Sequence, residues 1–142
     1  MELDIAKEKA IAYLMRSKKT SNEVTMKLKK LGFTEEIVQE VISYFTKLGY
    51  IDDNEYVDAY IRQCMRLQNY SLFEIKNKLL QKGVKKDIIE DKLQVLEDSD
   101  YEKELVKKLI NGKLKNMDDI KQRQYLFRRG FKNISEFINN EF

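Results

Sequence analysis

The stretch VTMKLKKLGF, residues 24–33, recurs as IKNKLLQKGV at residues 75–84 and as QRQYLFRRGF at residues 122–131. Each copy has a leucine four residues before a glycine and an isoleucine four or five residues after that glycine. The three glycines, which lie 51 and 47 residues apart, are Gly32, Gly83 and Gly130. A period of this length indicates tandem structural repeats. The third copy is the loosest, because it begins with a glutamine where the others have an aliphatic residue.

Helical periodicity and capping residues predict three short helices in the first repeat. Apolar residues on one face of 5–14 indicate the first helix, with Ile5 and Leu14 on its buried side. Thr20 and Glu23 have the spacing of a capping box, which begins the second helix. Thr34 is the expected cap of a third helix. The second and third helices are expected to bury Val24, Leu28, Leu31, Ile37, Val38, Val41, Ile42 and Phe45.

The second repeat restarts this pattern. Either Asp52 or Asp53 is expected to cap its first helix, and Ser71 with Glu74 forms another capping box. The buried face of the first helix is predicted to hold Tyr56, Val57, Tyr60, Ile61 and Cys64. Cys64 is interpreted as a small buried hydrophobic residue rather than as a catalytic thiol.

The third repeat is predicted to begin at a box of Ser99 and Glu102, with a middle helix over about 118–129. We therefore predict repeats at residues 1–49, 50–97 and 98–142. A unit of this size has little core of its own, so neighbouring units should pack together. The predicted fold is all-α, with three tandem three-helix repeats that form an elongated, curved array.

The composition supports an all-α fold and excludes several chemistries. The chain has 142 residues, with no proline and five glycines, so long stretches are free to be helical. It has no histidine and one cysteine, which excludes a histidine general base, a histidine–cysteine zinc site and a disulfide within the chain. We predict no catalytic residue, no metal site and no cofactor. The sequence has neither a run of about 20 apolar residues nor a basic leader, which predicts a cytoplasmic protein without a membrane segment.

Charge alternates in phase with the repeats. Residues 16–30 hold six basic residues and one acidic, residues 62–86 hold seven and one, and residues 113–132 hold seven and two. The intervening residues 35–58 and 87–104 are acidic, with seven acidic residues to one basic and eight to two. The net charge of +3 therefore conceals separate basic and acidic zones.

The basic zones are the candidate binding residues. Any single lysine or arginine could simply solvate a helix, but their recurrence indicates a track for a polyanion or for an acidic protein. Sequence-specific DNA reading is disfavoured, because no cluster of asparagine and arginine marks a recognition face. The candidates are Arg16, Lys18, Lys19, Lys27, Lys30, Arg62, Arg66, Lys76, Lys78, Lys82, Lys85, Arg128 and Arg129.

The aromatic residues and the paired carboxylates are better explained by structure than by chemistry. The spacing of Tyr13, Tyr44, Phe45, Tyr56 and Tyr60 is that of packing residues rather than of base-stacking platforms. The pairs 52–53 and 118–119 lie at predicted helix starts, where capping explains an aspartate better than acid–base or metal chemistry does.

A combination of motifs resembles the RecX family, the regulators of bacterial RecA recombinase. The run Leu48-Gly49-Tyr50-Ile51-Asp52-Asp53 is followed by Tyr56 and Tyr60, then by Ser71-x2-Glu74-Ile75-x3-Leu79-x2-Lys82-Gly83-Val84. The first repeat resembles the same family in Ala10-x2-Tyr13-Leu14, Arg16-Ser17, Lys27-Leu28, Leu31-Gly32-Phe33 and Val41-Ile42. The resemblance spans nearly all of the chain.

The resemblance implies three tandem three-helix repeats and a non-enzymatic role in DNA repair, recombination and the SOS response. It implies binding along the groove of the RecA filament on DNA, which lowers the ATPase, strand-exchange and coprotease activities of RecA. Basic residues of the repeats would face acidic RecA surface or DNA phosphates. Buried Tyr50, Tyr56 and Leu79 would hold the repeats together, and Gly49, Asp52, Asp53, Tyr60 and Gly83 complete the structural motif.

Three hypotheses of function follow. The leading one is a regulator that binds the RecA filament as a monomer and modulates its activities, with inhibition as the expected effect. The second is a helical protein that binds single- or double-stranded DNA non-specifically, without RecA, and loses affinity steeply with salt. The third is an adaptor for another helical assembly, since tandem helical repeats serve many partners.

Overall fold

The structure is a computed structural model that describes residues 1–141, and these residues form nine α-helices and no strand. The all-α prediction is therefore confirmed. The helices, three to a repeat, are α1 (Glu2–Leu14), α2 (Ser21–Lys30), α3 (Glu35–Lys47), α4 (Asp53–Leu67), α5 (Leu72–Gln81), α6 (Lys86–Glu97), α7 (Tyr101–Asn111), α8 (Asp119–Arg128) and α9 (Ile134–Glu141).

Local side-chain chemistry sets where most of these helices begin. The capping boxes of α2 and α5 are both formed, with Thr20 and Ser71 accepting from the backbone N–H of Glu23 and Glu74. Asp52, rather than its neighbour, caps α4 by accepting from the Glu55 N–H. The chain then leaves each middle helix through a glycine with positive φ, at Gly32, Gly83 and Gly130.

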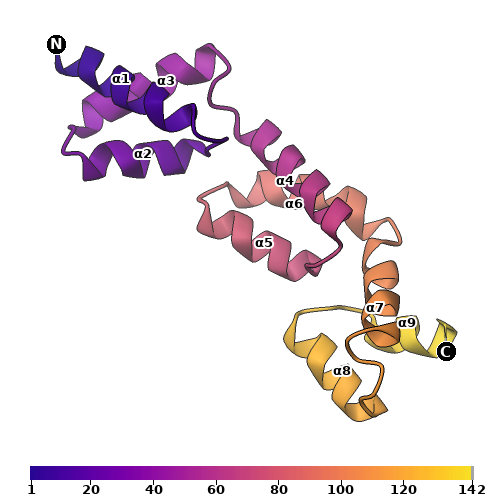
Figure 1. Cartoon of the computed structure of the whole chain (residues 1–142). Coiled ribbons are helices and arrows are strands. Elements are labelled where there is room, and N and C mark those ends of the chain that lie inside the picture. The colour runs from indigo at the N-terminus through magenta and orange to yellow at the C-terminus, as the bar shows by residue number, and fades with distance from the viewer. Residues whose placement is uncertain (142) are drawn as a thin grey trace.

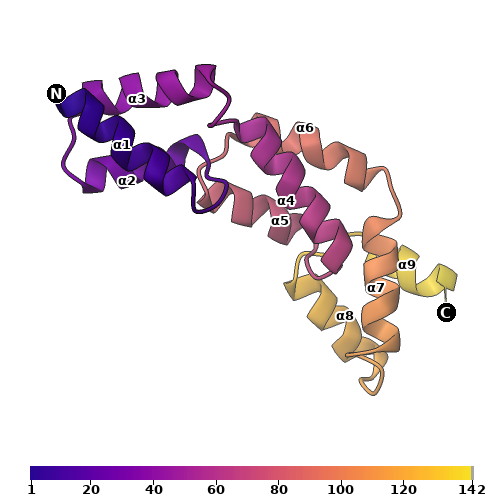
Figure 2. The ribbon, with the colours of Figure 1, turned by 45° about the horizontal axis from the view of Figure 1, so that its top comes forward.

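The repeats are arranged in a row that runs diagonally across Figure 1, and the same row is seen from another side in Figure 2. The middle helices α2, α5 and α8 follow one another along one side of this row. The N-terminal end of α2 lies next to the C-terminal end of α5, and the N-terminal end of α5 lies next to the C-terminal end of α8. The three middle helices therefore point in the same direction, head to tail.

Two hydrophobic cores stabilise the array. One is built from α1, α2 and α3, with Ile51 added from the following loop. The other is continuous from α4 to α9 and includes Cys64, which is buried as predicted, and Leu79. Repeats 2 and 3 therefore share buried apolar side chains, whereas repeat 1 has its own core.

Several predicted core residues are at the surface instead. Tyr50 is 52% exposed: it follows the turn at Gly49, and its ring forms a T-shaped pair with the Phe45 ring, with the centroids 5.9 Å apart. Tyr44 lies outward beneath the Lys7 ammonium, 3.9 Å from the ring centroid. Ile5 and Leu31 are also about half exposed, the second because it is the C-cap of α2. Leu14, Tyr56 and Tyr60 are partly buried.

The capping box predicted from Ser99 and Glu102 is not formed. Asp100 is the N-cap of α7, without a side-chain capping bond. Ser99 instead donates its hydroxyl to the Leu96 carbonyl and accepts from the Tyr101 N–H. The Glu102 carboxylate is buried and accepts from the backbone of Leu72, in the preceding repeat. A tertiary contact therefore replaces the local one.

In the part of the chain that the structure describes, none of the helices combines the length and the apolar character required to cross a membrane.

Candidate functional site

The middle helices, which follow one another along one side of the array (Figures 1 and 2), carry basic candidates from all three repeats. Lys27 and Lys30 lie on α2, Lys76 and Lys78 on α5, and Arg128 on α8. Other candidates lie elsewhere: Arg16, Lys18 and Lys19 precede α2, Arg62 and Arg66 lie on α4, and Lys85 is the N-cap of α6. We call the side formed by α2, α5 and α8 the basic edge.

Five of the candidates are exposed and form no hydrogen bond or ion pair within residues 1–138: Arg16, Lys30, Arg66, Lys85 and Arg128. Their side chains can therefore reach a phosphate or a carboxylate of a partner without breaking a contact inside the chain.

Tyrosine rings support three other lysines. The Lys19 and Lys27 ammonium groups lie 4.6 and 5.6 Å from the centroid of Tyr13. Lys78 lies 4.6 Å from the centroid of Tyr70. Rings placed in this way restrict the lysine side chains, which lowers the entropy that they would lose on binding.

Some candidates form ion pairs on the surface of the array. Lys18 and Arg62 both contact Glu55, at 3.2 and 3.1 Å. The hydrogen bond from Arg62, together with the Lys18 charge, lowers the pKa of Glu55. Lys76 pairs with Glu90 at 3.2 Å. These pairs are exposed and add little stability.

The last two candidates, Lys82 and Arg129, contribute to the junctions between repeats. At the junction of repeats 2 and 3, the buried Ser71 hydroxyl donates to the Arg129 carbonyl at 2.6 Å. The Arg129 guanidinium donates to the Glu74 carboxylate at 2.8 Å. The Leu72 N–H donates to Glu102 at 2.9 Å, and Phe73 packs against Gly130. We call this set of four contacts a junction clasp.

The same clasp joins repeats 1 and 2. The buried Thr20 hydroxyl donates to the Lys82 carbonyl at 2.7 Å, and Glu23 lies 3.5 Å from the Lys82 ammonium. The remaining two contacts also have counterparts: the Ser21 N–H and hydroxyl donate to Asp53 at 2.7 Å, and Asn22 packs against Gly83. Each clasp thus connects the first turn of one middle helix to the last turn of the next.

Charge makes the second clasp the stronger of the two. Burial would raise the pKa of Glu74, but hydrogen bonds from Arg129 and Ser71 outweigh it, so the pKa is lowered. Arg129 and Glu74 are only 20% and 27% exposed, whereas Lys82 at the first clasp is 43% exposed. A shorter and less hydrated pair is worth more free energy.

Glu102 is expected to give the second clasp a measurable pH dependence. Burial raises the pKa of Glu102 above its ordinary value of 4.5, in spite of hydrogen bonds from the backbone of Leu72 and Lys132. The folded chain therefore holds this proton more tightly than the unfolded chain, so the ionised carboxylate costs stability as the pH rises through the raised pKa. We expect the free energy of unfolding of Glu102→Gln, taken relative to that of the wild type, to be higher at pH 8 than at pH 4.

Urea unfolding of both proteins at the two pH values measures this difference. The matched control is Glu55→Gln, whose effect should have the opposite sign with pH, because the pKa of Glu55 is lowered. A Glu102→Gln difference that does not change with pH would contradict the expectation.

Sequence reasoning missed the junction clasps. It identified Thr20 and Ser71 as caps, but a capping hydroxyl also has a proton to donate, and its acceptor lies in another repeat. The one available signal was the recurrence of a hydroxyl, a glutamate three residues later and a glycine at matching positions of repeats 1 and 2.

Comparison with known proteins reveals one family. The model of the first three-helix domain of RecX matches residues 6–45, and the model of the second matches residues 52–93. The regulatory protein RecX of Caldanaerobacter subterraneus subsp. tengcongensis is 31% identical, over 98% of this chain and 72% of the relative. That of Clostridium botulinum strain Eklund 17B is 32% identical, over 80% of this chain and 54% of the relative.

Solved structures give the same result. The crystal structure of RecX from Lactobacillus salivarius aligns with a TM-score of 0.83 and 27% identity, over 97% of this chain and 95% of that one. A second crystal structure, of regulatory protein RecX, aligns with a TM-score of 0.84 and 25% identity, over 98% of this chain and 72% of that one.

Proposed function

Since this chain belongs to the RecX family of regulatory proteins, we propose that it binds the RecA filament on DNA and inhibits the ATPase, recombinase and coprotease activities of RecA. We propose that it does so as a monomer in the cytoplasm and without catalysis of its own. The absence of histidine and the single buried cysteine agree with a protein that acts by binding.

The observation that carries the proposal is the basic edge. Three helices, one from each repeat, follow one another along one side of the row and all carry lysines or arginines, so the cations are distributed along the array instead of being gathered in a pocket. A linear site of this kind fits an extended partner with repeated negative charge, and a filament of protein on DNA is such a partner.

The junction clasps support the same proposal. They fix each middle helix to the next through buried hydrogen bonds, which sets the spacing of cations along the edge before any partner binds. A site whose geometry is fixed in advance loses less entropy on binding than a flexible chain with the same charges would.

The test is hydrolysis of ATP by RecA from the same source on single-stranded DNA, with this protein added well below one molecule per RecA. Inhibition at that ratio supports action on the filament, because coating the DNA would require far more protein. We expect the triple variant Lys30→Glu, Lys78→Glu and Arg128→Glu to need at least roughly tenfold more protein for half inhibition, since one contact is reversed on each middle helix.

The matched control reverses the same number of charges away from the basic edge, at the exposed Lys9, Lys47 and Lys108 on α1, α3 and α7. We expect this control variant to inhibit like the wild type. Equal losses in the two triple variants would show that net charge, and not the basic edge, determines the inhibition.

A second candidate function is non-specific binding of single- or double-stranded DNA without RecA. The exposed cations that have no partner within the described side chains favour it, because phosphates could pair with all of them. It predicts that ATP hydrolysis falls only when the protein is sufficient to cover the DNA, and that the effect disappears with modest salt. The same titration therefore distinguishes the two functions.

A further inference from the structure

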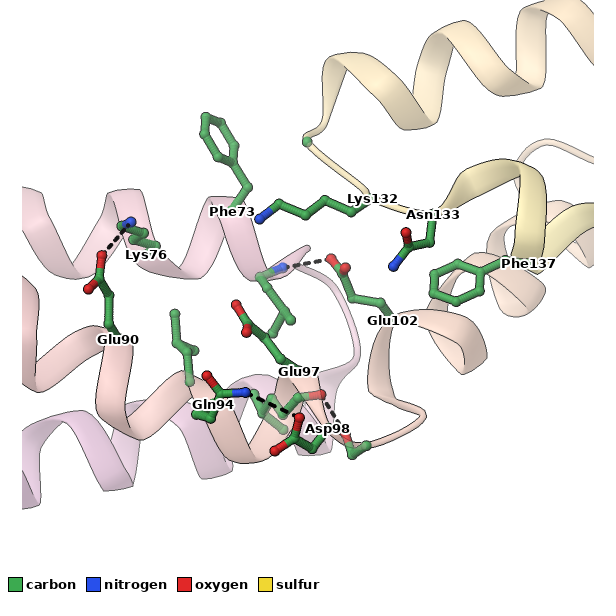
Figure 3. Close-up of a pocket in the computed structure, with 15 residues that line it drawn as sticks. Phe73, Lys76, Glu90, Gln94, Glu97, Asp98, Glu102, Lys132, Asn133 and Phe137 are labelled. Atoms are coloured by element: carbon green, nitrogen blue, oxygen red, sulfur yellow. Dashed lines mark hydrogen bonds and ion pairs between the residues drawn. The ribbon is translucent and has the colours of Figure 1, made fainter.

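A cleft lies between repeats 2 and 3, beside the second clasp, and of the candidates on the basic edge only Lys76 lines it. Its volume is about 610 Å³, and its walls come from α5, α6, the first turn of α7, the segment that connects α8 to α9, and α9 itself. The apolar part of its lining consists of Leu72, Phe73, Leu93, Leu96 and Phe137. Figure 3 shows the Phe137 ring directed at the cleft from one side and the Glu97 carboxylate near its centre.

The charged lining of the cleft has an excess of carboxylates. Four acidic side chains face two lysines there: Glu90, Glu97, Asp98 and Glu102 against Lys76 and Lys132. Lys76 is engaged with Glu90, and Glu102 accepts from the Leu72 N–H. Asp98 accepts from the Gln94 amide, while Glu97 makes no hydrogen bond or ion pair within residues 1–138. Figure 3 shows the Lys132 side chain extended across the cleft toward Phe73, and no ion pair joins it to Glu97 or Asp98 within residues 1–138. The lining therefore keeps an excess of negative charge at these two carboxylates.

Glu97 and Asp98 lie at the end of a helix where negative charge is unfavourable. Glu97 is the last residue of α6 and Asp98 is its C-cap, so both carboxylates are close to the negative end of the helix dipole. The equivalent place in repeat 1 carries no acid: 51 residues earlier, the corresponding residues are Thr46 and Lys47. The negative charge is thus a property of this junction and not of the repeat.

We propose that this cleft receives an arginine side chain of a protein partner, with the guanidinium between the Glu97 and Asp98 carboxylates. A planar guanidinium can donate to two carboxylates at once, and its stem can lie on the apolar lining of the cleft. Phosphates are repelled by the same carboxylates, so the occupant belongs to a protein and not to a nucleic acid.

The inference rests on the proposed function only for the identity of the partner, which would be the protein component of the filament. The basic edge and the cleft then differ in what they recognise: negative charge along the edge, and one positive side chain in the cleft. Two surfaces of opposite sign also select a partner more strictly than one basic surface can.

The direct test uses the full chain and two small probes. N-acetyl-arginine amide is titrated into the ¹⁵N-labelled protein, and N-acetyl-citrulline amide, which has nearly the same shape without the charge, is titrated in parallel. We expect the arginine probe to give saturable amide shifts that are concentrated in residues 96–102 and 130–133, and the citrulline probe to bind at least roughly tenfold more weakly. Shifts that do not saturate, or that are equal for the two probes, would overturn the proposal.

The variant Glu97→Gln with Asp98→Asn should abolish the saturable shifts. Both residues are exposed, and removing negative charge from a helix C-terminus does not weaken the helix, so the variant should fold. The matched control, Glu35→Gln with Glu36→Gln, removes two exposed acids from the first turn of α3 and should bind the probe like the wild type. Unchanged binding in the cleft variant would also overturn the proposal.

The RecA assay then connects the cleft to the partner. We expect the cleft variant to need roughly tenfold more protein for half inhibition and the Glu35–Glu36 control to need no more than the wild type. If the wild type inhibits and the cleft variant inhibits equally well, the cleft does not contact RecA and the proposed function stands. If the wild type has no effect on RecA, the proposed function fails, and the arginine titration still decides whether the cleft binds a guanidinium.

Discussion

Replacing Gly130 by alanine is expected to lower the free energy of unfolding by about 3 kcal/mol. Two effects add at this position. The φ of Gly130 is +84°, a backbone conformation that costs a residue with a Cβ roughly 1–2 kcal/mol in strain. The new Cβ would also lie 2.5–2.6 Å from Phe73, including the Cβ and Cγ atoms of that side chain, which are too close to the backbone to move aside cheaply.

Gly32 provides the matched control for this prediction, because it has a φ of +95° and no atom lies within 4 Å of the place that an alanine methyl group would take. Alanine there should cost only the conformational strain, about 1 kcal/mol. Urea unfolding measures both variants. Equal losses at the two glycines would mean that Phe73 does not restrict the junction. In the background of Phe73→Gly, which removes the Cβ as well as the ring, the cost at Gly130 should fall to that at Gly32.

Removing the Arg129 side chain is the second change with a large expected effect. Arg129→Ala should lower the free energy of unfolding by about 2 kcal/mol, because it leaves the partly buried Glu74 carboxylate without its cation. Lys82→Ala, at the first clasp, should cost less than about 1 kcal/mol, because that pair is longer and more hydrated.

A double-mutant cycle with Glu74→Gln separates the ion pair from the other contacts of Arg129, which include the Asn69 carbonyl. We expect a coupling energy of about 1 kcal/mol or more between the two residues. Because the pKa of Glu74 is lowered in the folded chain, this coupling is present above the ordinary carboxyl pKa of 4.5 and is lost as the pH falls through the lowered value. A coupling near zero at pH 7 would show that the pair does not hold the clasp together.

The helices and their caps could be predicted from the sequence because the interactions that set them are local. A hydroxyl and a glutamate three residues apart are enough to place the starts of α2 and α5. The same spacing at Ser99 and Glu102 gave a wrong prediction, because the Glu102 carboxylate accepts from the Leu72 N–H of another repeat instead of from the start of its own helix.

Exposure at helix ends was the other feature that periodicity could not predict. Burial of Leu31 was expected because it continues the apolar pattern of its helix, and burial of Tyr50 was implied by the family resemblance. Both residues lie just past the end of a helix, and both are about half exposed. The sequence could identify the charged residues of the candidate site, but it could not show which of them lie on the same surface. The sequence shows that cations recur with the repeat, whereas the side of the array on which they gather depends on how the clasps turn one repeat against the next.

The direction of the clasps makes the whole array polar. Each one joins a hydroxyl at the start of a middle helix to a carbonyl at the end of the following middle helix, and never the reverse. The two ends of the row therefore differ. At the α2 end, no atom lies within 4 Å of where a Cβ on Gly32 would be. At the α8 end, the cap is Asp118, whose ionised carboxylate accepts hydrogen bonds but has no hydroxyl to donate. Filaments built from identical subunits have a direction as well. On the proposed function, an array with unlike ends would match such a filament in one orientation only, so its two ends would always meet different neighbours.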